Sequence, residues 1–392
     1  MRILFVTYCR AMLGANRSLV QLMIDLRERY DVEPYVLMPA VEDGSLHEEL
    51  ERLKIPYFIH PMKAWVVSEN AKFQRLRGIK ACIENKIYLK KIKDKIVDKR
   101  FELIYSNNST IQTGADLSKR MKLPHIWHVR EYGKADYHIV FSYAHKAVKA
   151  KFGAATAVIA VSKGIESYIK ESISPSAKTI CIYNGIYSRK PLREDWNEDQ
   201  KLNFCYVGAL QDGKNQLELL KAVDTLLREK ITDFHVTLVG EGGDYERELR
   251  EYCNRNTLNS YITFTGYCGD VMKLLDGMDV GVICSQNEAF GRVTVEYMLS
   301  SMPVIGAKGS GTDEIIQHEV NGYLYQGGEV DQLAGYMKNM IMDRDEMKEK
   351  GKNAYVYAQE NFTSERTAKQ IYQVIKQSVT LKIPVTDRDI EK

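Results

Sequence analysis

The chain has 392 residues, of which 44% are hydrophobic and 27% charged. This length suits two domains of about 150 to 200 residues, each able to bury a core, and the composition excludes a fibrous or disordered chain. With 55 Lys and Arg against 52 Asp and Glu, the formal net charge of +3 does not indicate nucleic-acid binding, so we expect no nucleic-acid partner.

The seven cysteines are scattered and include no CxxC pair, so the sequence predicts neither a disulfide framework nor a zinc site. The apolar run at the N-terminus is shorter than the core of a signal peptide, and no stretch of about 18 apolar residues occurs. We therefore expect a cytoplasmic chain without a membrane-spanning segment.

Short apolar runs alternate with amphipathic stretches, which is the pattern of parallel strands joined by crossover helices. In the first half, strands are predicted at residues 2–8, 33–38, 56–60, 103–107, 125–129, 157–161 and 179–184. In the second half, they are predicted at residues 203–208, 235–240, 262–265, 280–285 and 303–307. The predicted fold class is α/β, with two Rossmann-like domains.

A polar, charged segment at residues 186–201 is typical of an exposed linker between the two halves. We expect one domain over residues 1–190 and a second over residues 191–363. Residues 364–392 are expected to form a helix that crosses back onto the first domain, followed by a mobile tail.

Loops rich in glycine or charge follow the predicted strands at their carboxyl ends, where open parallel sheets bind ligands. Residues in these loops include Gly14, Lys214, Gly240, Tyr267, Glu288 and Gly309. The sequence HVREYG follows another of these strands, and GSGT at residues 309–312 can bring backbone close to a ligand or form an ordinary turn.

The stretch EAFGRVTVE places Glu288 and Glu296 around a helix that we expect to open at Gly291. Free N–H groups at a helix start suit a diphosphate, and carboxylates accept hydrogen bonds from sugar hydroxyls. Lys214, between a strand and a helix, can reach a phosphate as a compact charge. Three alternatives stay open: Glu288 only complements the helix dipole, Glu296 is a surface residue, and Lys214 is a solvated loop lysine.

Residues 203–325 carry VGALQDGKNQ, VGEGGDYERELR, ITFTGYCGDV, EAFGRVTVEYMLSSMPVIGAKGSGTDEII and HEVNGYLY, in this order. In these motifs the chain resembles the retaining family-4 glycosyltransferases of the GT-B fold, of the bacterial polysaccharide and glycolipid type. The resemblance extends over nearly the whole chain. It implies an acceptor-side first domain, a second domain that binds a nucleotide-sugar, and a deep cleft between them.

The resemblance also implies roles for single residues. Glu288, Lys214 and His128 would be catalytic, with Lys214 neutralising the diphosphate and the other two contacting the donor sugar. Glu296 would bind the ribose and Gly14 would approach the diphosphate. Further donor-binding positions would be Gly240, Tyr267, Cys268, Val271, Phe290, Gly291, Arg292 and Val293.

Two positions depart from the family pattern. Ala209 stands where members often have an arginine that pairs with the diphosphate, and Ala15 follows Gly14 where two glycines are frequent. Arg292 and Arg17 are candidates for the missing phosphate contact.

The resemblance implies retaining, front-face transfer of a hexose-type sugar from a nucleotide diphosphate donor, with UDP expected, to a glycan or lipid-linked acceptor. No cofactor or metal is expected, and the DRD sequences at 343–345 and 387–389 are interpreted as solvated charge. A first alternative, motivated by Ala209, is a non-catalytic sugar-nucleotide-binding subunit that activates a partner glycosyltransferase. A second, suggested by GEGG at residues 240–243, is a nicotinamide-dependent oxidoreductase.

Residues 72–100 contain eleven Lys or Arg against three acidic residues. Apolar residues recur there at near-helical spacing, at Leu76, Ile79, Ile83, Ile87, Ile92 and Ile96. Such a helix can lie on the anionic cytoplasmic face of a membrane and bring the enzyme to a lipid-linked acceptor. The alternative is a solvated helix face on the acceptor-side domain.

Overall fold

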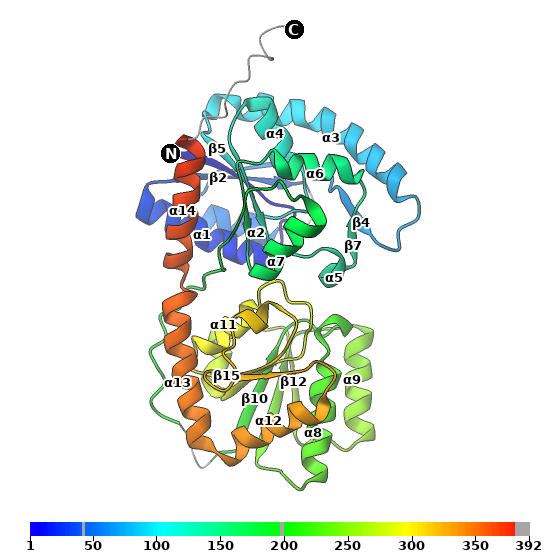
Figure 1. Cartoon of the computed structure of the whole chain (residues 1–392), viewed down its shortest axis with the longest axis vertical. Helices are drawn as coiled ribbons and strands as arrows, with labels where there is room; N and C mark the ends of the chain where they lie inside the picture. The colour runs from blue at the N-terminus through cyan, green and yellow to red at the C-terminus, as the bar shows by residue number, and fades with distance from the viewer. Residues whose placement is uncertain (41–43, 197–199, 381–392) are drawn as a thin grey trace. The chain divides into compact units, whose positions relative to one another are not determined.

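The computed structural model describes residues 1–40, 44–196 and 200–380. The chain divides into two compact units, drawn in Figure 1. The N-terminal domain consists of Met1–Gly185 together with the helix that begins at Ser364, and the C-terminal domain of Ile186–Thr363. The first domain thus ends a few residues before the expected position 190. The expected tail, with the DRD at 387–389, lies outside the described residues.

A seven-stranded parallel sheet forms the centre of the N-terminal domain, in the order β3-β2-β1-β5-β6-β8-β9. Its strands are β1 (Arg2–Val6), β2 (Glu33–Pro39), β3 (Tyr57–His60), β5 (Leu103–Ser106), β6 (His125–Val129), β8 (Ala157–Ala160) and β9 (Thr179–Cys181). A separate antiparallel pair is formed by β4 (Val66–Ser68) and β7 (Ile139–Phe141).

Helices cover both faces of this sheet, which is why its strands are nearly continuous apolar runs. Ile3 and Phe5 pack into one core cluster with residues of α1, whereas Leu4 and Val6 pack into another with residues of α3 and α4. The helices are α1 (Gly14–Tyr30), α2 (Ser45–Arg52), α3 (Gln74–Ile96), α4 (Thr113–Met121), α5 (Lys134–Tyr137), α6 (His145–Gly153), α7 (Lys163–Tyr168) and α14 (Ser364–Thr380).

The C-terminal domain is built on a six-stranded parallel sheet in the order β12-β11-β10-β13-β14-β15. Counted within the domain, this order is 3-2-1-4-5-6, that of the dinucleotide-binding Rossmann fold. Its strands are β10 (Leu202–Val207), β11 (Phe234–Val239), β12 (Ile262–Gly266), β13 (Val280–Ile283), β14 (Val304–Ala307) and β15 (Gly322–Tyr325). Its helices are α8 (Gln216–Arg228), α9 (Asp244–Arg255), α10 (Val271–Leu274), α11 (Arg292–Met298), α12 (Val330–Met342) and α13 (Arg344–Asn361).

The final described helix, α14, packs on α1, and the two lie side by side in Figure 1. The rings of Tyr30 and Tyr372 stack with centroids 4.2 Å apart. Thr367 Oγ1 donates a hydrogen bond of 2.8 Å to the carbonyl of Tyr183. This helix is therefore part of the N-terminal core.

Several element boundaries differ from those predicted. Seven strands end one to three residues earlier than expected: β1 at Val6, β5 at Ser106, β8 at Ala160, β9 at Cys181, β10 at Val207, β11 at Val239 and β13 at Ile283. The short strands β4, β7 and β15 were not predicted, since three or four residues carry too little periodicity to be recognised. No helix in the described part of the chain is long and apolar enough to cross a membrane.

Candidate functional site

The strand order of the C-terminal domain reverses between β10 and β13, which pair in parallel with Phe204 opposite Val280. Ligands of open α/β sheets bind at such a switch point, beyond the carboxyl ends of the strands. Lys214 lies in the segment that follows β10, and Glu288 in the loop that follows β13. The topology therefore brings these two predicted site residues to one place.

Lys214 and Glu288 form an ion pair, in which Lys214 Nζ donates to Glu288 Oε1. The Ser285 hydroxyl donates to the same carboxylate oxygen at 2.7 Å. The two charged side chains are 28% and 21% exposed, so the pair is largely shielded and only partly open to solvent. Lys214 is therefore not a freely solvated loop lysine, and Glu288 does more than complement a helix dipole.

The pKa of Glu288 reflects opposing influences. Burial acts to raise this pKa, but the charge of Lys214 and the hydrogen bonds from Lys214 and Ser285 outweigh burial, and the pKa is lowered. The carboxyl group is thus ionised at neutral pH. An ionised carboxylate accepts hydrogen bonds, as the predicted contact with sugar hydroxyls requires.

Tyr206, which the sequence did not single out, fixes the backbone that carries Lys214. Its side chain is only 1% exposed, and its hydroxyl donates to the carbonyl of Lys214 at 2.6 Å. Lys214 ends a short 3₁₀ turn, Asp212–Lys214, and Asn215 follows in the left-handed conformation. The lysine is held by a turn and a buried tyrosine.

The GSGT loop after β14 braces the loop that contains Glu288. The backbone N–H of Gly311 donates to the carbonyl of Glu288 at 2.6 Å. A Cβ at Gly311 would lie 2.6 Å from the Cα of Phe290, so only glycine allows this approach. The GSGT sequence was expected to bring its backbone close to a ligand or to form an ordinary turn. In the structure, the close approach is between the backbones of Gly311 and Phe290.

The predicted helix start at Gly291 is present, with α11 running over Arg292–Met298. Gly291 has a φ of 91°, and a Cβ there would meet Thr312 Oγ1 at 2.7 Å. Because α11 has only two turns, its dipole is weaker than that of a long helix. Lys214 is therefore the stronger candidate for a phosphate contact.

Glu296 lies within α11 and is only 7% exposed, so the alternative that it is a surface residue is wrong. Arg292 Nε donates to its Oε1 at 2.9 Å. Arg292 is therefore fixed beside Glu296 on α11, and its contact with a phosphate stays a prediction.

Gly240 has a structural role. Its φ is 143°, and a Cβ would lie 2.0 Å from the carbonyl oxygen of Gly208 in the neighbouring loop. Tyr267, after β12, is 68% exposed, Cys268 is partly exposed, and Val271 begins α10. Contacts of these residues with a nucleotide stay predictions.

In the N-terminal domain, Gly14 is the first residue of α1. Nothing lies within 4 Å of a Cβ built there, so no neighbouring atom of the chain requires a glycine at this position.

Asn16, which the sequence did not single out, holds the loop that precedes α1. Its side chain accepts a hydrogen bond from Thr7 Oγ1 at 2.6 Å and donates one to the carbonyl of Ala11 at 2.8 Å. Arg17 Nε donates to the carbonyl of Met12 at 3.1 Å.

His128 is completely buried. Its Nδ1 lies 2.5 Å from the Tyr105 hydroxyl and 3.1 Å from Arg130 Nη2. Burial, aided by the Arg130 charge, lowers the pKa of His128 well below its ordinary value, so the ring is neutral. Its predicted contact with the donor sugar stays a prediction, and Arg130 is the more accessible member of this cluster.

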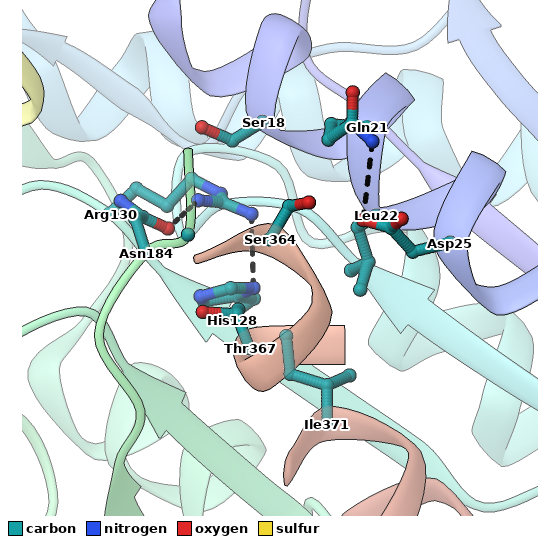
Figure 2. Close-up of a pocket in the computed structure, with 11 residues that line it drawn as sticks. Ser18, Gln21, Leu22, Asp25, His128, Arg130, Asn184, Ser364, Thr367 and Ile371 are labelled. Atoms are coloured by element: carbon teal, nitrogen blue, oxygen red, sulfur yellow. Dashed lines mark hydrogen bonds between the residues drawn. The ribbon is translucent and has the colours of Figure 1, made fainter. Parts of the chain in front are cut away.

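Figure 2 shows Arg130 reaching both Asn184 and His128, beside the first turns of α14. Arg130 Nε also donates to Asn107 Oδ1 at 3.0 Å. The cavity beside this cluster has a volume of about 10 Å³, close to the least that one water needs. It is lined by Ser18, Gln21, Leu22, Asp25, His128, Arg130, Asn184, Gly185, Ser364, Thr367 and Ile371.

Glu131, next to Arg130, has a buried carboxyl group that the sequence did not single out. Its Oε1 accepts hydrogen bonds from the backbone N–H and the hydroxyl of Ser109, at 2.7 and 2.6 Å. Burial raises the pKa of Glu131, although these hydrogen bonds oppose the shift. The motif HVREYG thus supplies His128, Arg130 and Glu131 at the end of β6.

Within the described residues, no group of three or more His, Cys, Asp or Glu could hold a metal ion.

A chain that contains two Rossmann-like domains is also found among solved proteins. Anabaena Alr3699/HepE, solved in complex with UDP, is similar to this chain with a TM-score of 0.78 and 24% identity, over 96% of this chain and 100% of that one. A glycosyltransferase from Rickettsia africae gives a TM-score of 0.76 with 17% identity, over 97% and 99% of the two chains. The chain has the GT-B fold of glycosyltransferases.

Residues 188–357, nearly the whole C-terminal domain, match the family Glycosyl transferases group 1. The match covers 170 of the 392 residues of the chain.

Two curated relatives extend this match. The N-acetyl-alpha-D-glucosaminyl L-malate synthase of Bacillus anthracis is 26% identical over 222 residues, which are 54% of this chain, and the chain covers 57% of that relative's length. An uncharacterised glycosyltransferase of Methanocaldococcus jannaschii is 28% identical over 302 residues, covering 71% of this chain and 76% of that protein.

Proposed function

We propose that the protein is a retaining, metal-independent glycosyltransferase of family 4 that moves a hexose-type sugar from a UDP-sugar to a glycan or lipid-linked acceptor. The observation that carries this proposal is the ion pair of Lys214 and Glu288 at the switch point of the C-terminal sheet. UDP as the carrier is supported by HepE, which was solved with UDP and with UDP-glucose.

Lys214 has the chemistry to stabilise the leaving group. As the bond between the sugar and the diphosphate breaks, negative charge grows on the phosphate oxygen, and a fixed ammonium stabilises it in the transition state. Removing one charge-assisted contact of this kind costs roughly 1.5 to 4 kcal/mol, or about one to three orders of magnitude in rate.

Glu288 is assigned to the sugar and not to a covalent intermediate. Lys214 and Ser285 both donate to one of its oxygens, Oε1, an arrangement that suits a hydrogen-bond acceptor for hydroxyls better than a free nucleophile. In the proposed front-face step, the bond from the anomeric carbon to the phosphate oxygen breaks and a bond to the acceptor oxygen forms on the same face. The acceptor proton passes to the leaving phosphate, so atoms and charge balance without a metal.

The nature of the acceptor is supported by the kinds of relatives and by one surface of the N-terminal domain. One relative is an N-acetyl-alpha-D-glucosaminyl L-malate synthase, and others are a sulfoquinovosyl transferase of Arabidopsis thaliana and a phosphatidylinositol monomannoside mannosyltransferase of Mycobacterium tuberculosis. We assign a glycan or lipid-linked acceptor because an exposed face of the N-terminal domain, described below, suits a lipid surface.

The second candidate function is a sugar-nucleotide-binding subunit without its own activity, which Ala209 favours because it lacks the arginine of the family pattern. The purified chain, incubated with UDP-sugars and candidate acceptors, distinguishes the two. Turnover by the chain alone supports the enzyme, whereas binding without turnover, restored by a partner, supports the subunit.

A panel of nucleotide-sugars tests donor identity. A ligand at 100 times its dissociation constant adds about 2.7 kcal/mol to the free energy of unfolding, which a thermal shift detects. Stabilisation by UDP-sugars and UDP, but not by NADH, is expected. NMR of the product should show the anomeric configuration of the donor, and inversion would refute the retaining mechanism. Loss of activity in chelator with recovery in manganese would refute metal independence.

A further inference from the structure

The helix α3 of the N-terminal domain has two apolar faces. One face is buried and includes Leu89, Ile92 and Ile96. The opposite face carries Leu76, Ile79, Ile83 and Ile87, which are 63%, 58%, 57% and 55% exposed. We call these four residues the α3 stripe. The six apolar residues that recur at near-helical spacing in the sequence are thus divided between two faces, since Ile92 and Ile96 belong to the buried one.

Spacings of three and four residues keep the α3 stripe on one side of the helix. The other side is fixed to the domain. Asn85 donates to the carbonyl of Lys63 at 2.8 Å and accepts from its N–H at 2.9 Å. A Cβ at Gly78 would lie 2.3 Å from the carbonyl oxygen of Ser142, so the helix sits directly on the neighbouring backbone. The α3 stripe therefore cannot turn inward without unpacking the helix.

The surroundings of the α3 stripe are strongly basic. From Gln74 to Ile96 the helix contains eight Lys or Arg and two acidic residues. Lys80, Lys86, Lys90 and Lys91 are exposed and flank the stripe at helical spacing. Among the described residues, none of these four lysines forms an ion pair with a carboxylate.

We infer that the N-terminal domain docks on an anionic membrane surface through the α3 stripe and its flanking lysines. An interfacial helix places apolar side chains among the acyl chains while lysines extend to the phosphates of the headgroups. A protein partner fits less well, because lysine is depleted in protein–protein interfaces. Figure 1 shows α3 as a long helix along the outer side of its domain.

Membrane docking concerns a surface remote in sequence from Lys214 and Glu288, and it stands whether or not the proposed transfer reaction is correct. The test is flotation of the full chain with vesicles of phosphatidylcholine alone or with phosphatidylglycerol added. Binding is expected only to the vesicles with phosphatidylglycerol, and it should weaken as salt is raised.

The charge variant replaces Lys80, Lys86, Lys90 and Lys91 with Gln. Each lysine near an anionic surface contributes about fivefold to partitioning, so the variant should bind more than about 100-fold more weakly. The matched control replaces four exposed lysines elsewhere with Gln, namely Lys273, Lys352, Lys369 and Lys376, and should bind as the parent does.

The apolar variant I83S/I87S should lose most vesicle binding while its Tm stays near that of the parent, since both side chains are already exposed. Its control is V320S/V356S, at two other exposed apolar positions, which are 48% and 45% exposed. Binding that is unchanged in both α3 variants would overturn the inference. So would a dimer, detected by analytical ultracentrifugation, that I83S/I87S dissociates while the parent fails to bind vesicles.

Discussion

Lys214 and Glu288 are ion-paired across the switch point of the C-terminal sheet, although 74 positions separate them in the chain. Each charge neutralises the other in a site that is only partly open to solvent. A bound donor would give each a new partner, the diphosphate for the lysine and sugar hydroxyls for the carboxylate. The two side chains should therefore contribute to different parts of donor recognition.

Lys214→Ala should weaken the binding of UDP itself, because the diphosphate loses its fixed positive charge. We expect kcat/KM to fall by about one to three orders of magnitude. Isothermal titration with UDP and steady-state kinetics measure the two effects. Lys214→Arg retains the charge and should recover part of the binding. A Lys214→Ala variant with unaltered UDP affinity would show that the diphosphate lies elsewhere.

Glu288→Gln should reduce sugar transfer more than it weakens UDP binding, whereas Lys214→Ala should weaken the binding of UDP itself. The amide keeps the shape of the side chain, and its oxygen can still accept from Ser285, so UDP affinity should change by no more than about threefold, within about 0.7 kcal/mol. Transfer should fall by at least about tenfold, because a neutral amide is a weaker partner for the sugar hydroxyls. If UDP and the UDP-sugar both lost affinity equally, Glu288 would act on the phosphate site through Lys214.

The lowered pKa of Glu288 predicts how stability depends on pH. In the folded protein this pKa lies below its ordinary value of 4.5, because Lys214 and the hydrogen bonds outweigh burial. The ionised group thus stabilises the fold above about pH 4.5, and this stabilisation is lost as pH falls through the lower, folded-state pKa. Urea unfolding should show that Glu288→Gln destabilises the protein more at pH 7 than at pH 3.

Lys214→Ala reverses this pH dependence. Without the lysine charge, burial becomes the largest influence on Glu288 and raises the pKa of its carboxyl group. The ionised form then destabilises the folded state, so stability should decline as pH rises above about 4.5. Parallel unfolding curves for the parent and this variant at every pH would show that the ion pair does not control the titration.

Much of this fold and site could be predicted because both depend on local patterns. Apolar runs marked the strands, and the carboxyl ends of parallel strands meet at one edge, which brought Lys214 and Glu288 together. The approach of Gly311 to Phe290 could not be predicted, since a glycine does not specify the backbone it contacts. The burial of His128 could not be predicted either. Both faces of its strand are covered, so the alternation of polar and apolar residues does not indicate which side chains are buried.

Gly14→Val tests the predicted approach of the first domain to the diphosphate. The built Cβ meets nothing within 4 Å, so the Tm should stay within a few degrees of the parent value while transfer activity falls. Gly240→Ala is the contrasting variant, because its Cβ would meet the Gly208 carbonyl at 2.0 Å and its φ is 143°. Gly240→Ala should lose stability, and any loss of its activity should follow from that loss. Full activity in a stable Gly14→Val protein would remove Gly14 from the donor site.

Tyr267 provides a test of where the base binds. Its side chain is 68% exposed after β12, at the same carboxyl edge as Lys214, so truncation should cost the fold little. If the uracil stacks on the ring, Tyr267→Ala should raise the Kd of UDP about fivefold or more, and Tyr267→Phe should keep the parent value. Tyr187→Ala, which removes another exposed tyrosine, is the control. Equal UDP affinity in all three variants would mean that the base is held by other residues of the domain, because loss of a stacking partner cannot leave the binding free energy unchanged.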